Sequence, residues 1–172
     1  MKQICILCKT NAVDEPEQTS VRNITGGVCK SCNRSFNTSS TAAILKTLAD
    51  AIDAPVLVMQ AEPRQVYTAN RKALELFNKG LDRIEKHRGG QVFDCVYAFT
   101  EAGCGKDVHC QQCKIKNAIV ETLSTGRPYK DISALLDIKT STGTSTYTVQ
   151  ISTEKIGDMA LVRMDQYKHK GQ

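Results

Sequence analysis

Four cysteines near the middle of the chain have the type and spacing of a metal or redox site. They are Cys95, Cys104, Cys110 and Cys113, spaced C-x8-C-x5-C-x2-C within nineteen residues. Thiolates gathered in this way bind a structural metal, hold an iron–sulfur cluster or exchange reversibly with a disulfide. We call these four residues the central quartet, and the sequence alone leaves the three uses open.

Zinc in a four-cysteine shell is the first interpretation of the central quartet, because it would hold a loop that has no core of its own. An iron–sulfur cluster that responds to oxygen or redox state is the second interpretation. A thiol–disulfide switch is the third, since Cys110 and Cys113 are expected at the amino end of a helix, where the dipole stabilises thiolates. In a further variant His109 replaces one sulfur as a ligand.

Four more cysteines lie within residues 1–36 and form the N-terminal quartet. They make two C-x2-C pairs, Cys5 with Cys8 and Cys29 with Cys32, separated by twenty residues. Each pair can point two sulfurs at one ion, so both pairs complete the tetrahedral sulfur shell that zinc accepts. The polar segment between them cannot fold on apolar residues, and bound metal would supply most of its stability. The spacing resembles zinc-ribbon and treble-clef fingers, and we predict a structural zinc here.

The charge and the start of the chain indicate where the protein works. The formal net charge of +5 counts all eight cysteines as neutral, and two four-thiolate zinc sites would lower it to about +1. No apolar run approaches the ~20 residues needed to cross a bilayer, and the first ten residues lack a signal-peptide core. We therefore expect a cytoplasmic protein without membrane contact, whose cysteines serve metal or redox chemistry.

The sequence offers little support for an enzyme. A C-x2-C-His haem attachment site fails because Lys114 follows Cys113. A zinc deaminase would need His-x-Glu and Pro-Cys-x-x-Cys, and neither is present. A redox enzyme using Cys110 and Cys113 stays a lesser hypothesis, to be removed if no thiol-dependent turnover is found. We expect no catalysis.

The first half of the chain predicts a helix, two short strands and a second helix. N-cap residues and apolar spacing predict a linker helix over residues 37–53, ended by Pro55. This helix either packs on the core or pairs with a second copy of the chain. Strands are expected at 56–59 and 65–68, and a helix capped by Asn70 is expected to end at Gly80.

The second half predicts an irregular region, one long helix and a meander of three strands. Residues 81–113 should contain short helices together with the central quartet, and the helix that follows should stop at Gly126. Alternating apolar residues then predict strands around 132–138, 147–151 and 159–164. This order is an α+β arrangement, an antiparallel sheet with helices gathered on one face.

The order of elements over residues 41–167 resembles the PAS family of sensory domains. The segments that carry the resemblance are the strand opening at 54–58, the passage from strand to helix at 66–73, and Gly-Arg-Pro-Tyr at 126–129. Residues 103–113 resemble a cysteine-containing PAS subtype of bacterial signalling proteins. The resulting domain plan is a four-cysteine finger at 1–36, a linker helix at 37–53, a PAS-like domain at 54–167 and a polar tail at 168–172.

The resemblance implies a cytoplasmic sensor or adaptor. In PAS proteins the helical half, where the central quartet would lie, usually walls a ligand pocket and moves when the ligand or its redox state changes. The asparagine–cysteine–arginine motif of flavin-binding light sensors is absent, so flavin photochemistry is not expected. PAS domains commonly dimerise, so we expect a homodimer through this domain or the linker helix, and a separate signalling partner. The pocket's ligand is left open.

A nucleic-acid-binding regulator is the alternative reading of the N-terminal finger. Its basic residues Lys9, Arg22, Lys30 and Arg34 would then contact phosphates. Residues 1–40 hold five basic and three acidic residues, and bound zinc would reduce this formal charge to about zero. No aromatic residues alternate with the basic ones as in stacking nucleic-acid binders. A protein-contact role is favoured for the finger.

Overall fold

The computed structural model describes residues 43–171 of the chain. The N-terminal quartet, the predicted finger and the first part of the predicted linker helix lie outside these residues. The chain divides into two units between Ile44 and Leu45, and the fold reported below is that of the second unit.

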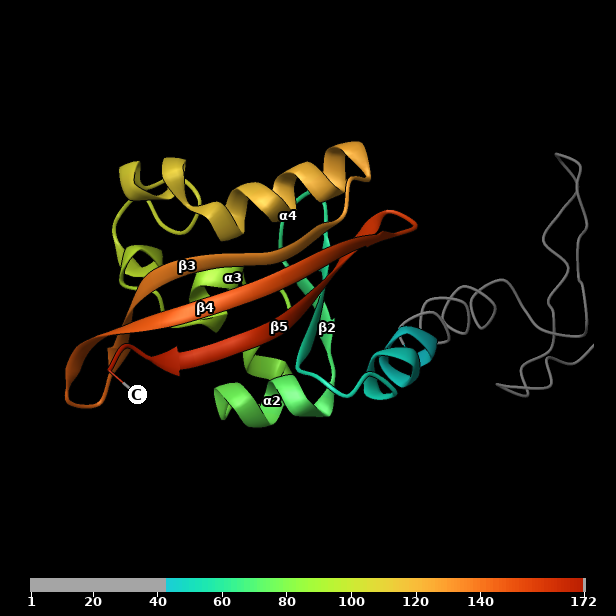
Figure 1. The fold of residues 1–172 in the computed structure, drawn as a ribbon, viewed down its shortest axis with the longest axis horizontal. Helices are drawn as coiled ribbons and strands as arrows, with labels where there is room; N and C mark the ends of the chain where they lie inside the picture. Colours follow the sequence, from blue (N-terminus) through green and yellow to red (C-terminus); the bar gives the residue numbers. More distant parts are fainter. Residues whose placement is uncertain (1–42, 172) are drawn as a thin grey trace, which may run out of the picture. The chain divides into compact units, whose positions relative to one another are not determined.

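The described residues form one five-stranded antiparallel sheet (Figure 1). Its strand order is β2-β1-β5-β4-β3, so the first strand lies between the second and the last. The two long hairpins, β3 with β4 and β4 with β5, form the other half of the sheet. The strands are β1 (Val56–Gln60), β2 (Val66–Ala69), β3 (Tyr129–Thr140), β4 (Gly143–Ile156) and β5 (Met159–His169).

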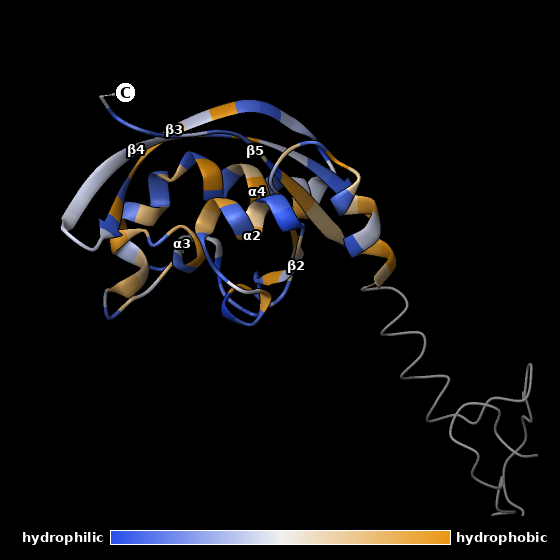
Figure 2. Cartoon of the chain, turned by 90° about the horizontal axis from the view of Figure 1, so that it is seen from below, coloured by the Kyte–Doolittle hydropathy of each residue, from blue (hydrophilic) through white to orange (hydrophobic). Residues whose placement is uncertain are grey.

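Helices between β2 and β3 pack against one face of this sheet (Figure 2). They are α2 (Arg71–Phe77), α3 (Gly89–Val92) and α4 (Lys114–Thr125), with short 3-10 turns η1 (Leu81–Arg83), η2 (Val96–Phe99) and η3 (Val108–Gln112). Gly126 ends α4 in the left-handed conformation with φ of 79°, as the sequence predicts. The predicted α+β arrangement is confirmed for the described residues.

The core lies between this sheet face and the helices. The core is made of aliphatic and aromatic side chains, and their burial supplies the main driving force for folding. The core residues include Leu57, Met59, Ile84, Val92, Phe93, Ile115, Ile119, Val149, Ile151, Val162 and Met164.

Asn70 ties the beginning of the domain together from the interior. Its side chain is 1 % exposed and uses its full hydrogen-bonding capacity. Oδ1 accepts from the backbone N–H groups of Val56 and Ala73, and Nδ2 donates to the carbonyl oxygens of Ala49 and Ala54. The residue that caps α2 therefore also fixes β1 and the helical segment that precedes it.

Several predicted boundaries are wrong: β3 and β4 extend beyond the predicted 132–138 and 147–151, and the ends of α2 and β5 differ as well. The helix α2 ends at Phe77 rather than at Gly80, because Asn78 adopts the left-handed conformation (φ 49°) and its N–H bonds back to the last turn. The strand β5 continues to His169 instead of ending near 164 before a polar tail. Tyr167 explains the extension, since its ring packs against those of Phe77 and Tyr147 at centroid distances of 5.7 and 5.0 Å.

The helical segment before β1 packs on the domain through few residues. Among its described residues, 43–50, Ala49 is 2 % exposed whereas Leu48 is 62 % exposed. The predicted apolar face is therefore only partly used for packing. Within residues 43–171, every helix is too short or too polar to cross a bilayer.

Candidate cysteine site

The central quartet lies in the irregular region between the core helices and the edge of the sheet. Cys95 precedes η2, Cys104 lies in the following loop, Cys110 is in η3, and Cys113 is the N-cap of α4. Cys95 and Cys110 are buried, the other two are half-buried, and all four are free thiols. The structure brings them together closely enough that charge on any of the other three raises the pKa of Cys95.

Backbone N–H groups donate to two of the four sulfurs. Gly90 donates to Cys104 Sγ at 3.3 Å, and Lys116 donates to Cys113 Sγ at 3.5 Å. The predicted position of Cys113 at the amino end of a helix is thus confirmed. Such N–H donors stabilise thiolates and are found around cysteine-bound metals and iron–sulfur clusters.

Burial acts against ionisation of two of these thiols. It raises the pKa of Cys95 from 9.0 to about 11, with the Tyr97 N–H opposing the shift. The pKa of Cys104 is also raised, first by burial, and is opposed by the Gly90 N–H and by Arg64 and Arg88. Without a cation at the site, Cys95 is therefore a neutral thiol near pH 7, whereas a bound metal would favour its thiolate.

The donor set suits a thiophilic metal, but its atoms do not form a closed shell. Among residues 43–171, no group of three or more His, Cys, Asp or Glu side chains is arranged so that it could hold a metal ion. Metal binding would require the sulfurs to draw together. The loop that carries Cys104 has two glycines with positive φ, Gly103 at 75° and Gly105 at 85°.

Backbone contacts attach the quartet to both β3 and α4. Cys95 forms an isolated antiparallel bridge with Ile138 of β3, and the N–H of Lys139 donates to the carbonyl of Asp94 at 2.8 Å. At the other end, Cys113 accepts the N–H of Lys116 in the first turn of α4. Movement of the quartet would therefore act on the edge strand and on the longest helix of the described residues.

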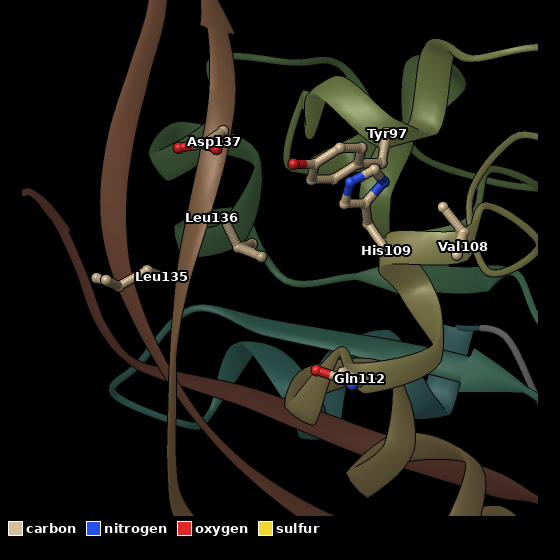
Figure 3. A pocket seen from close by; sticks show the side chains of 7 residues that line it. All are labelled: Tyr97, Val108, His109, Gln112, Leu135, Leu136 and Asp137. Carbon is tan, nitrogen blue, oxygen red and sulfur yellow. The ribbon is translucent and has the colours of Figure 1, made fainter.

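A pocket of about 440 Å³ opens beside the quartet, between η2, η3 and β3 (Figure 3). The rings of Tyr97 and His109 stack at 4.2 Å on one side, and Leu136 points toward them from β3. The lining residues are Tyr97, Val108, His109, Gln112, Leu135, Leu136 and Asp137.

His109 makes contacts of its own beside the quartet. Its Nδ1 lies 2.8 Å from Asp107 Oδ1, and the N–H of His109 holds the pKa of that carboxyl below its usual range. Nδ1 is therefore engaged, which leaves Nε2 as the ring nitrogen open to a metal. Sequence reasoning missed the stack of His109 on Tyr97, because eleven residues of irregular chain separate the two residues and no periodicity relates them.

No protein-family model matches the sequence, and no curated protein matches it either. Solved structures match the fold instead. The LOV protein of Rhodobacter sphaeroides superposes with a TM-score of 0.50 and 10 % identity, over 78 % of this chain and 69 % of that one. A variant of RsLOV gives a TM-score of 0.50 and 13 % identity, over 77 % and 69 % of the two chains.

A third match is the PAS domain of nitrogen regulation protein NR(II) from Vibrio parahaemolyticus. It has 16 % identity and a TM-score of 0.44, over 72 % of this chain and 97 % of that one. At the identities of the two LOV structures, the likeness concerns the fold alone. The part of the chain that the structure describes has a PAS-like fold, as the order of its elements predicts.

Proposed function

We propose that this chain is a sensory signal-transduction protein in which the central quartet is the responsive element of a PAS-like domain. The four sulfurs bind one metal ion, with zinc as the first candidate, and the state of this site is transmitted to a partner. The observation that carries the proposal is the attachment of the quartet to two elements at once: Cys95 is bridged to β3, and Cys113 caps α4.

The attachment gives a physical route from site to surface. Closing four thiolates on one ion shifts Cys95 relative to Cys113, because the described structure does not already hold them in a closed shell. The shift acts on β3, which is the edge strand of the sheet, and on the first turn of α4. A metal supplies cross-linking and charge neutralisation at this place, and the chain supplies the N–H donors that stabilise its thiolates.

The remaining features of the proposal rest on the sequence. The N-terminal quartet binds a structural zinc, the protein acts in the cytoplasm without catalysis, and a homodimer forms through the PAS-like domain or the linker helix. The 62 % exposure of Leu48 supports pairing through the helix, because a large apolar side chain there lacks cover within the described residues.

An iron–sulfur cluster is the second candidate at the central quartet. The two backbone N–H groups that donate to Cys104 and Cys113 favour it, since such hydrogen bonds tune cluster potentials. A thiol–disulfide switch would use the same residues. The nucleic-acid alternative depends on residues 1–40, which lie outside the described fold.

Metal and acid-labile sulfide content of the full-length protein, purified without oxygen, tests the proposal. We expect about two zinc ions per chain and no sulfide. A Cys104→Ser/Cys113→Ser variant should lose one of them, and a Cys5→Ser/Cys8→Ser variant the other. Iron, sulfide and an air-sensitive visible spectrum, lost in the first variant only, would instead assign the cluster.

Hydrogen exchange then tests transmission. Removing the central metal should speed amide exchange in β3 and at the start of α4, with β1 as the internal reference. Metal content that is the same in wild type and in the Cys104→Ser/Cys113→Ser variant would refute the metal proposal. If metal removal speeds amide exchange only in residues 100–109, the route through β3 and α4 is refuted.

A further inference from the structure

Two arginine side chains converge on the loop that carries Cys104. Arg64 comes from the segment after β1, and Arg88 is the N-cap of α3. Both guanidinium groups lie against Gly105, where a Cβ would collide with Nη2 of Arg64 and lie 3.2 Å from Nη1 of Arg88. The two cationic groups are therefore close to one another on one side of the loop.

Neither arginine is neutralised by an acid. Both side chains are half-buried, and no Asp or Glu among residues 43–171 forms an ion pair with Arg64 or Arg88. Arg88 Nη1 donates to the carbonyl oxygen of Cys104 at 3.2 Å, which anchors it without balancing its charge. Two like charges held together and partly removed from water are unfavourable unless an anion accompanies them.

The two guanidinium groups meet at Gly105, which has no side chain to contact them. A planar guanidinium presents paired N–H donors that match the oxygens of a phosphate or a carboxylate.

We infer that Arg64 and Arg88 form a binding site for an oxyanion, a phosphate or carboxylate group, at Gly105. Glycine suits this position because a Cβ would collide with Arg64 and crowd Arg88, and the φ of 85° strains other residues. The neighbouring Lys106 is exposed and adds positive charge to the approach. Arg88 also contacts the carbonyl oxygen of Cys104, so metal binding in the central quartet would be coupled to anion binding at this site.

A titration of the isotope-labelled full-length protein with inorganic phosphate, followed by NMR at constant ionic strength, tests this inference. We expect saturable shifts of the Gly103 and Gly105 amide signals and of the guanidinium signals of Arg64 and Arg88. Arg64→Gln and Arg88→Gln should each weaken phosphate binding by about tenfold or more, because each removes charge-assisted hydrogen bonds.

Arg127→Gln is the matched control, since it removes the same charge at the far end of α4, where Arg127 faces Glu121 and Tyr129. It should leave phosphate binding unchanged. Acetate titrated in the same way separates the sources: tighter binding of phosphate assigns a phosphoryl ligand, and tighter binding of acetate assigns a carboxylate-bearing one. Arg64→Lys keeps the charge, and weaker binding in that variant would show that the paired donors matter.

Circular dichroism and thermal unfolding of each variant show whether it folds, and phosphate should raise the Tm of the wild type but not of Arg64→Gln. Two results would overturn the inference. One is the absence of saturable shifts with either anion. The other is phosphate affinity that is equal in the wild type and in both glutamine variants, which would mean general attraction to a basic surface.

Discussion

Cys95 and Ile138 pair through their backbones, so one member of the central quartet is joined directly to the edge of the sheet. Its thiol is buried beneath that junction, and burial raises the pKa from 9.0 to about 11. A chemically reactive group is thus held in its neutral form at a place where the chain connects the cysteine loop to β3.

Alkylation kinetics should report this protection. In metal-free protein at pH 7.5, we expect iodoacetamide to modify Cys95 about 100-fold more slowly than in the urea-unfolded chain, because the thiolate is the nucleophile. The native rate should keep rising between pH 9 and 11, whereas the unfolded rate levels off near pH 9. Mass spectrometry of the peptide containing Cys95 measures both, and equal rates in the two states would contradict the raised pKa.

Replacing Asn70 by Ala should destabilise the domain by roughly 3 kcal/mol or more, since four hydrogen bonds to the buried backbone groups of Val56, Ala73, Ala49 and Ala54 are lost. Asn70→Asp should also be destabilising, because a carboxylate oxygen would face two carbonyl oxygens. Urea unfolding gives both values. The exposed Asn117→Ala, which loses one bond to Gln111, serves as control and should change stability by less than about 0.5 kcal/mol.

A buried pair of hydroxyls connects α4 to β4. Thr122 Oγ1 donates to the carbonyl of Arg127 at 2.8 Å, so Thr153 must donate the 2.7 Å bond between the two hydroxyls. Thr122→Val should cost about 1–2 kcal/mol, and Thr122→Val/Thr153→Val less than the sum of the single changes, because no hydroxyl is left unpaired. A double-mutant cycle measured by urea unfolding checks this, and strict additivity would argue against the contact.

Asp50 makes the stability of the fold depend on pH in the acidic range. The N–H of Arg71 is the main cause that holds the pKa of Asp50 below its ordinary 3.8, with Lys46 assisting. A lowered pKa stabilises the fold above pH 3.8, and this contribution is lost as the pH falls through the lowered value. Asp50→Asn should therefore be less stable at pH 7, by less than about 1 kcal/mol because the carboxylate is partly exposed.

Unfolding curves of the wild type and Asp50→Asn, recorded from pH 7 to pH 2, measure this contribution. The two should converge in acid. Asp158→Asn, in the exposed turn between β4 and β5, is the matched control and should follow the wild type throughout. A stability difference that is independent of pH would show that Asp50 acts through packing rather than charge.

Much of the fold follows from local signals in the sequence. Asn70 as an N-cap, Gly126 as a helix stop and the alternation in the last hairpins were all readable, because each depends on neighbours within a few residues. The end of β5 was not, since Tyr167 is held in the sheet by Phe77 and Tyr147 from distant parts of the chain.

Some residues of the candidate sites could be predicted from the sequence, and others could not. Spacing identified the four cysteines of the central quartet as a group, and the structure does bring them into one region. The arginines at Gly105 carried no signal, because Arg64 and Arg88 belong to separate segments and meet only through the fold. Chemistry that depends on side chains from several loops leaves no periodic trace in the sequence.

The place of β1 between β2 and β5 sets the order in which the domain can be completed during synthesis. Residues 56–60 leave the ribosome about a hundred residues before their partner strand at 159–169. Until β5 emerges, β1 can pair only with β2 and exposes an apolar edge. The sheet can therefore be completed only after β5 has been synthesised, and a ribosome stalled before residue 159 would carry a nascent domain in need of a chaperone.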